Sequence, residues 1–364
     1  MTALDPTSGK APSPHLLGLV PDELAAHLRS RGLKLSDSEA RRLIAHRLVP
    51  DGRRHAERHP VSRALLEAAR LHTREDRLGI VERVSDAADG FVKYLLRSPD
   101  GALSEAVRIP LDKPGHYSVC LSSQVGCAMA CVFCATGRLG LTRNLEAWEM
   151  VAAFLAVRDE APGRVSGAVF MGQGEPLHNY DEVMRAARVL SHPCGGQIAA
   201  KAISISTVGL VPQIRRYTAE RQPYRLIVSL TSAVETRRRE LLPVVGKTPL
   251  KELAEALRDH ARASRTRLTI AWVLLGGVNS GEDEVLALQA LLAGVPLRIN
   301  LIDVNDARPG GYSRADDAER GAFMSRLQVL KTPVVRRYSG GSQRHAACGM
   351  LASTLCDSDE VTQF

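Results

Sequence analysis

The chain has 364 residues, 45% of them hydrophobic and 24% charged, which suits one large catalytic domain with an appendage. It contains no run of about eighteen apolar residues and does not begin with a signal-peptide pattern, so we expect a cytoplasmic protein without a membrane-spanning helix. The formal net charge of +8 favours an anionic partner such as nucleic acid.

The first part of the chain predicts a small helical unit followed by a short β extension. Helical periodicity marks residues 22–29, 36–47 and 61–71, each preceded or opened by Pro, Ser or Asp. Short β-like runs follow at 79–84, 91–96 and 102–109, separated by turn signals such as Asp89-Gly90. We therefore expect a helical accessory domain over residues 1–75 and a β linker region over 76–112.

From residue 117 onward, short apolar strands alternate with helices. The expected strands are 117–121, 167–171, 202–206, 225–230, 267–274 and 297–302, with a weaker candidate at 334–338. The expected helices are 145–157, 181–191, 250–263 and 283–292. This alternation predicts an α/β fold of about six parallel units, a partial (β/α)6 barrel over residues 113–356 with a tail at 357–364.

Polar motifs stand directly after five of these strands. In chain order they begin at Cys127, Gly172, Ser206, Ser229 and Asp303. The carboxyl ends of parallel barrel strands meet at one face, where active sites form. The motifs therefore predict a single site built from several strand ends.

The cysteines indicate metal or redox chemistry, because seven of them occur in a chain without a secretory signal. Cys127, Cys131 and Cys134 follow the spacing C-x3-C-x2-C. Three thiolates can hold three irons of a [4Fe–4S] cluster and leave the fourth open for the amino and carboxylate groups of S-adenosylmethionine (SAM). A zinc site completed by another Cys or a His is the alternative.

A glycine-rich turn at residues 172–176 brings one carboxylate to the next strand end. Gly174 permits a close approach of the backbone to a ligand, and Glu175 can pair with the α-ammonium group of SAM. An ordinary turn is the other interpretation. The position one βα unit after the cysteines favours a SAM clamp.

These residues resemble the RlmN/Cfr family of radical SAM methyltransferases, which methylate ring carbons of adenine in RNA. The resemblance runs from about residue 17 to 353. It is carried by the segments 122–127 (SSQVGC), 174–177 (GEPL), 206–209 (STVG), 300–302 (NLI) and 346–349 (AACG).

The resemblance implies roles for residues that the spacing alone does not assign. Cys348 resembles the cysteine that carries the methyl group, and Cys120 resembles the thiol that releases the product through a transient disulfide. Glu105 matches the residue to which the family assigns removal of a proton, and Cys120 is the competing candidate for this base. Alternatively, Glu105 has no catalytic role and is an ordinary solvated residue on a strand. The positions that match the family's SAM contacts are Ser206, Ser229, Leu230, Thr231 and Asn305.

The resemblance also implies partners: ribosomal or transfer RNA, and an electron donor such as flavodoxin or ferredoxin. The sequence departs from the family pattern at Gln173, Thr231 and residues 304–307. Methyl transfer is therefore better supported than the identity of the RNA.

The second candidate function is the same chemistry on a nucleoside or other small metabolite. A non-catalytic iron–sulfur or zinc protein that binds RNA is a third reading, but simple binding needs no thiol pair. We expect Cys194 and Cys356 to be structural or surface thiols.

Overall fold

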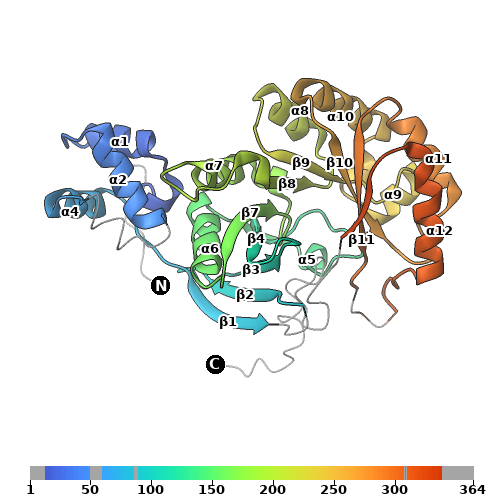
Figure 1. Cartoon of the computed structure of the whole chain (residues 1–364), viewed down its shortest axis with the longest axis horizontal. Coiled ribbons are helices and arrows are strands. Elements are labelled where there is room, and N and C mark those ends of the chain that lie inside the picture. Colours follow the sequence, from blue (N-terminus) through green and yellow to red (C-terminus); the bar gives the residue numbers. More distant parts are fainter. Residues whose placement is uncertain (1–12, 50–59, 86–88, 307, 309, 338–364) are drawn as a thin grey trace.

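The computed structural model describes residues 13–49, 60–85, 89–306, 308 and 310–337 (Figure 1). Ten strands of this part form one sheet in the order β1-β2-β3-β4-β7-β8-β9-β10-β11-β12. The strands β1 to β4 pair antiparallel, whereas each strand from β4 to β12 pairs parallel with the next. The bounds are β1 (Gly79–Ser85), β2 (Val92–Arg97), β3 (Leu103–Pro110), β4 (His116–Leu121), β7 (Arg164–Phe170), β8 (Ile203–Thr207), β9 (Arg225–Ser229), β10 (Leu268–Leu274), β11 (Leu297–Asp303) and β12 (Val334–Arg337).

Helices connect the parallel strands and cover their outer face. Six βα units follow one another within the described residues, beginning with β4 and ending with β11, so the predicted partial (β/α)6 barrel is confirmed. The connecting helices are α6 (Ala147–Asp159), α7 (Tyr180–Ser191), α8 (Val211–Ala219), α10 (Leu250–Ser264), α11 (Glu282–Leu291) and α12 (Asp317–Leu327). The sequence analysis did not predict α8, α12 or the short helix α9 (Glu235–Leu241). None of the helices in the described part is long and apolar enough to cross a bilayer.

The helices α1 (Pro21–Ser30), α2 (Asp37–Leu48) and α4 (Arg63–His72) form the N-terminal unit, which Figure 1 shows at one end of the molecule. The 3-10 turn η1 (Leu16–Gly18) contacts α6 and α7, and the His15 ring stacks on Trp148 of α6 with ring centroids 4.3 Å apart. Ser36 caps α2 by accepting a hydrogen bond from the Glu39 amide. All three helices agree with the sequence prediction. The division into domains at residues 75 and 112 stays a prediction.

The two faces of the sheet differ in chemistry because side chains alternate along each strand. Residues such as Val228, Trp272 and Leu301 point outward and join the main apolar core under the helices. Ile227, Ala271 and Ile302 point the other way, toward the inside of the barrel. The inner face is the one that forms the site.

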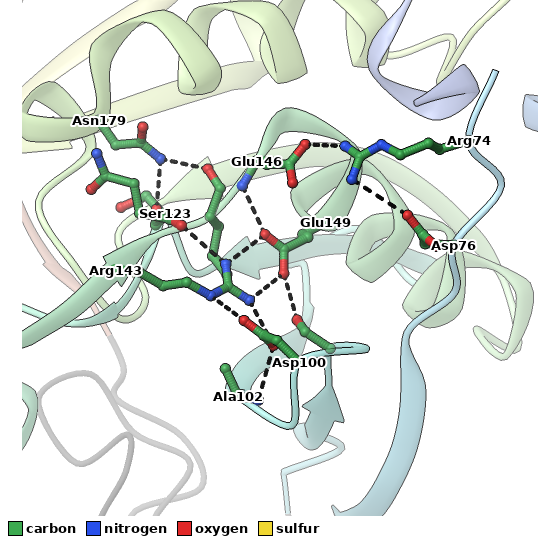
Figure 2. A network of polar contacts seen from close by, with 12 residues as sticks. Arg74, Asp76, Asp100, Ala102, Ser123, Arg143, Glu146, Glu149 and Asn179 are labelled. Atoms are coloured by element: carbon green, nitrogen blue, oxygen red, sulfur yellow. Dashed lines mark hydrogen bonds and ion pairs between the residues drawn. The ribbon is translucent and has the colours of Figure 1, made fainter. Parts of the chain in front are cut away.

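A short hairpin links the cysteine-rich loop to the rest of the molecule. It consists of β5 (Gln124–Gly126) and β6 (Leu141–Asn144), and Arg143 of β6 lies between two carboxylates (Figure 2). The guanidinium donates to both oxygens of buried Glu149 at 2.8 Å and to Asp100 at 2.7 and 3.1 Å. Glu149 also accepts from the Ser98 hydroxyl at 2.5 Å and from the Glu146 amide at 2.8 Å. The network fixes the hairpin against the start of α6 and the β2–β3 turn.

We expect Arg143→Met to lower the free energy of unfolding by about 3 kcal/mol, because the buried Glu149 carboxylate loses its cation. This loss is at the lower end of the range for removing one partner of a buried ion pair, because Ser98 and the Glu146 amide still donate hydrogen bonds to the Glu149 carboxylate. Arg216→Met is the matched control, because Arg216 also pairs with two carboxylates but lies on the surface. The control is expected to lose less than about 1 kcal/mol. Urea unfolding of both variants measures the difference, and equal losses would contradict a structural role for the network.

Candidate functional site

A cavity opens where the carboxyl ends of the parallel strands meet. It is lined by the predicted cysteines, the glycine-rich turn after β7 and residues from the ends of four further strands: Cys127, Met129, Cys131, Phe133, Cys134, Thr136, Met171, Gly172, Gly174, Glu175, Pro176, Ser206, Thr207, Val208, Ser229, Leu242, Val273, Ile302, Asp303, Val304 and Asn305. The structure thus brings together motifs that lie as much as 178 residues apart, from Cys127 to Asn305. This is the single site that the strand-end motifs predicted.

The cysteine loop is shaped by two glycines. Gly126 has φ +78°, and a Cβ there would lie 2.0 Å from the Gly140 carbonyl oxygen, which accepts a hydrogen bond from the Cys127 amide at 2.7 Å. A Cβ on Gly137 would lie 2.9 Å from the backbone of Cys131. Side chains at either position would displace the loop. The glycines therefore hold the three thiols at the mouth of the barrel.

The surroundings of the thiols suit a cationic metal cluster. Burial raises the pKa of Cys127 to about 12, and burial with the neighbouring thiols raises that of Cys131 well above its ordinary value. Bound iron would offset the free-energy cost of ionising these buried thiols, because a metal ion stabilises thiolates. In the described part of the chain, no three His, Cys, Asp or Glu side chains are gathered around one point as ligands of a single ion. The three thiols line one cavity, and a cubane would bind each of them through a different iron.

Glu175 is held rigidly at the cavity wall. Gly174 before it has φ +97°, and a Cβ there would meet the Gln124 side chain at 2.6 Å. The Glu175 carboxylate is 2% exposed and accepts hydrogen bonds from the amides of Val208 at 2.8 Å and Leu177 at 3.0 Å. Burial raises its pKa to about 7 although these hydrogen bonds favour the ionised form. A cationic ligand in the cavity would favour the ionised form of Glu175 again. The ammonium group of SAM is such a cation.

The other expected SAM contacts divide into two groups. Ser206, Ser229 and Asn305 line the cavity. Leu230 and Thr231 are fully buried and lie outside its wall. The Thr231 backbone has φ +61°, and its carbonyl accepts a hydrogen bond from the Asn279 amide group at 2.7 Å.

Arg238 of α9 is a buried cation that the sequence analysis missed. It is 2% exposed, and its guanidinium donates to the carbonyls of Leu230 at 2.5 Å and Val208 at 2.6 Å. Burial lowers its pKa to about 10, and the thiol of Cys131 is close enough to interact with its charge. Arg238 therefore joins the ends of β8 and β9 beside the cysteine loop. The sequence analysis assigned no role to the run Arg237–Arg239.

Glu105 of β3 and Cys120 of β4 lie on the inner face of the sheet and do not line the cavity. Val107 of β3 pairs with both Cys120 of β4 and Lys93 of β2, so these side chains share one face with Glu105, two residues before Val107. The ammonium of Lys93 and the carboxylate of Glu105 form an ion pair at 3.4 Å, with both side chains at most 2% exposed. Lys93 was not predicted, because only the strand register brings it to Glu105. Cys348 and Cys356 lie outside the described residues.

The chain is similar to known proteins along most of its length. Residues 121–288 match the Radical SAM superfamily. A probable RNA methyltransferase of Anaeromyxobacter sp. (strain Fw109-5) is 48% identical over 341 residues, which cover 93% of this chain and 98% of the relative. A probable dual-specificity RNA methyltransferase RlmN of Alkaliphilus metalliredigens (strain QYMF) is 33% identical over 351 residues, which cover 96% and 98%.

The crystal structure of a radical SAM methyltransferase from Sphaerobacter thermophilus has the same fold. It superposes with a TM-score of 0.82 at 33% identity, covering 93% of this chain and 98% of that one. The resemblance drawn from the motifs is thereby confirmed, and a radical SAM enzyme implies both SAM and a [4Fe–4S] cluster. With the three thiols and Glu175 in one cavity and relatives that match over nearly their whole length, this chain belongs to the RlmN family of radical SAM RNA methyltransferases.

Proposed function

We propose that this enzyme methylates a ring carbon of an adenine in ribosomal or transfer RNA, through a methylated cysteine and a transient disulfide. The observation that carries the proposal is one inner face that holds the cysteine cavity, Glu175, Cys120 and Glu105. The relatives' names as RNA methyltransferases and the net charge of +8 support RNA as the substrate.

Cys127, Cys131 and Cys134 are proposed to hold the cluster, and Glu175, Ser206, Ser229 and Asn305 to hold SAM. When bound, the cluster and SAM supply a methyl group and a 5′-deoxyadenosyl radical. Glu175 orients the ammonium group of SAM, and Ser206, Ser229 and Asn305 offer hydroxyl and amide hydrogen bonds. Leu230 and Thr231 contribute from behind the cavity wall by setting the backbone after Ser229. An electron donor such as flavodoxin or ferredoxin is proposed to supply the reducing electron.

The thiol pair is proposed to act in sequence. Cys348 accepts the methyl group, gives up one hydrogen atom from it, and bonds through that carbon to the adenine ring; the resulting adduct radical would pass one electron back to the oxidised cluster. Glu105, which forms an ion pair with buried Lys93, removes the ring proton from the adduct. Cys120 then attacks the sulfur of Cys348, the released carbon takes up a proton to become the methyl group of the base, and a thiol reductant reduces the disulfide that remains.

The substrate is tested by offering RNA and free nucleosides to the same enzyme. The reconstituted protein, SAM and a reducing system are incubated with ribosomal RNA, transfer RNA or adenosine monophosphate, and the digested products are analysed by mass spectrometry. We expect a methylated adenosine from one of the RNAs and none from the nucleotide. Methylation of the nucleotide alone would replace this proposal with the small-metabolite alternative.

A further inference from the structure

Three arginines on the inner face of the barrel form a second feature, which we name the basic floor: Arg225, Arg298 and Arg337. Arg225 lies four residues before Ser229 on β9, and Arg298 lies four residues before Ile302 on β11. Side chains four residues apart on a strand point the same way, and Ser229 and Ile302 line the cavity. Arg337 of β12 pairs with Ile302 and so shares that face. All three arginines therefore lie on the cavity side of the sheet. Arg225 and Arg298 lie about 13 Å along their strands from the cavity-lining residues, whereas Arg337 lies level with Ile302.

Within the part of the chain that the structure describes, the arginines of the basic floor have no carboxylate partner. No ion pair or side-chain hydrogen bond involves any of the three within residues 13–49, 60–85, 89–306, 308 and 310–337. The adjacent Arg336, by contrast, pairs with Asp303 at 2.9 Å. Arg225 and Arg337 are exposed and Arg298 is half-buried, so all three guanidinium groups are accessible to solvent.

Arg298 and Arg337 are also close enough to Arg225 to repel its charge. Burial, followed by repulsion from Arg298 and Arg337, lowers the pKa of Arg225. Like charges held together without an anion reduce the stability of the folded chain, and a bound anion would reverse that effect. Such a cluster on the inside of a catalytic barrel indicates an anionic ligand rather than an ordinary solvated surface.

We infer that the basic floor binds phosphate groups of the RNA whose adenine enters the cavity. This inference rests on the proposed function, since it supplies a binding site for the same substrate. Guanidinium groups match phosphate oxygens through paired hydrogen bonds, and they attract any RNA sequence equally. The distance of Arg225 and Arg298 from the cavity-lining residues places the phosphates bound there on nucleotides that flank the target nucleotide.

The test compares two triple variants of the full chain with its cluster reconstituted. One carries Arg225→Gln, Arg298→Gln and Arg337→Gln. The control removes the same charge from exposed side chains that lack a carboxylate partner in the described part: Arg164→Gln, Arg215→Gln and Lys251→Gln. The dissociation constant for a single-stranded RNA oligonucleotide is measured at several salt concentrations.

We expect the basic-floor variant to bind the RNA about 10- to 100-fold more weakly, and its logarithmic salt dependence to fall by about 2, as three lost phosphate contacts on a single strand require. The control should change affinity by less than about threefold. A third variant with Lys at the three positions keeps the charge and should keep the salt dependence. Removing the repulsion should not lower the unfolding temperature, so a folded protein is available for the measurement.

Two outcomes would overturn the inference: unchanged RNA affinity in the basic-floor variant, or an equal loss in the control. SAM cleavage without RNA should be the same in both variants and the unaltered enzyme. If the unaltered enzyme binds no RNA yet methylates a free nucleotide, the proposed function has failed. If it binds RNA and the basic-floor variant binds it equally well, only the inference about these arginines has failed.

Discussion

Replacing Cys127, Cys131 or Cys134 by Ala is expected to abolish both the iron–sulfur absorbance and the cleavage of SAM. Each cysteine supplies a ligand for a different iron, so two thiols cannot hold the cubane in this cavity. The anaerobically reconstituted unaltered protein should contain about four irons, and each variant close to none. Iron analysis, visible absorbance and chromatography of 5′-deoxyadenosine measure the three quantities.

Cys194→Ala is the matched control for this experiment, because Cys194 is half-buried and does not line the cavity. It should retain full iron and full SAM cleavage. Folding is checked by thermal unfolding of the apoproteins, which lack the cluster in every case. A well-folded protein that takes up zinc but no iron would contradict the proposed cluster site.

Replacing Cys120 and replacing Cys348 by Ala are expected to stop the reaction at different steps. With Cys348→Ala, no methylated protein and no covalent RNA adduct should form, because the methyl acceptor is gone. With Cys120→Ala, methylation of Cys348 and attachment to the RNA should proceed, but release by disulfide formation cannot. The RNA should therefore stay bound to the protein through denaturing electrophoresis and disappear on nuclease digestion.

Tryptic mass spectrometry of the Cys120→Ala protein should locate the adduct at Cys348. Normal turnover by this variant would show that another group releases the product. An adduct in the Cys348→Ala protein would show that the methyl group reaches RNA by another residue. Either result would contradict the proposed order of the two thiols.

The sequence predicted which residues line the cavity where a motif is formed by residues near one another in the chain. The cysteine spacing and the motifs after successive strands predicted the cavity, because parallel strands place their carboxyl ends together. Helices α8, α9 and α12 escaped prediction for local reasons. Helix α8 has Pro212 in its first turn, α9 is short and rich in arginine, and α12 contains Gly321 among charged residues.

Other features depend on tertiary structure that periodicity does not specify. The ion pair of Lys93 and Glu105 requires the register between β2 and β3, and the basic floor requires that between β9, β10, β11 and β12. Leu230 follows cavity-lining Ser229 but lies behind the wall, as successive side chains at a strand end face opposite ways. Arg238 is one of three consecutive arginines, and only the fold shows that it is buried close to Cys131.

The fate of a deuterated methyl group tests the central claim most directly. The enzyme is given SAM with three deuterons on its methyl carbon, together with the RNA that it modifies. If the methyl group passes through Cys348 and loses a hydrogen there, one deuteron should appear in 5′-deoxyadenosine, and the methyl group on the adenine should retain two. Direct transfer of an intact methyl group to RNA would leave all three deuterons on the base and none in 5′-deoxyadenosine, and that result would contradict the account.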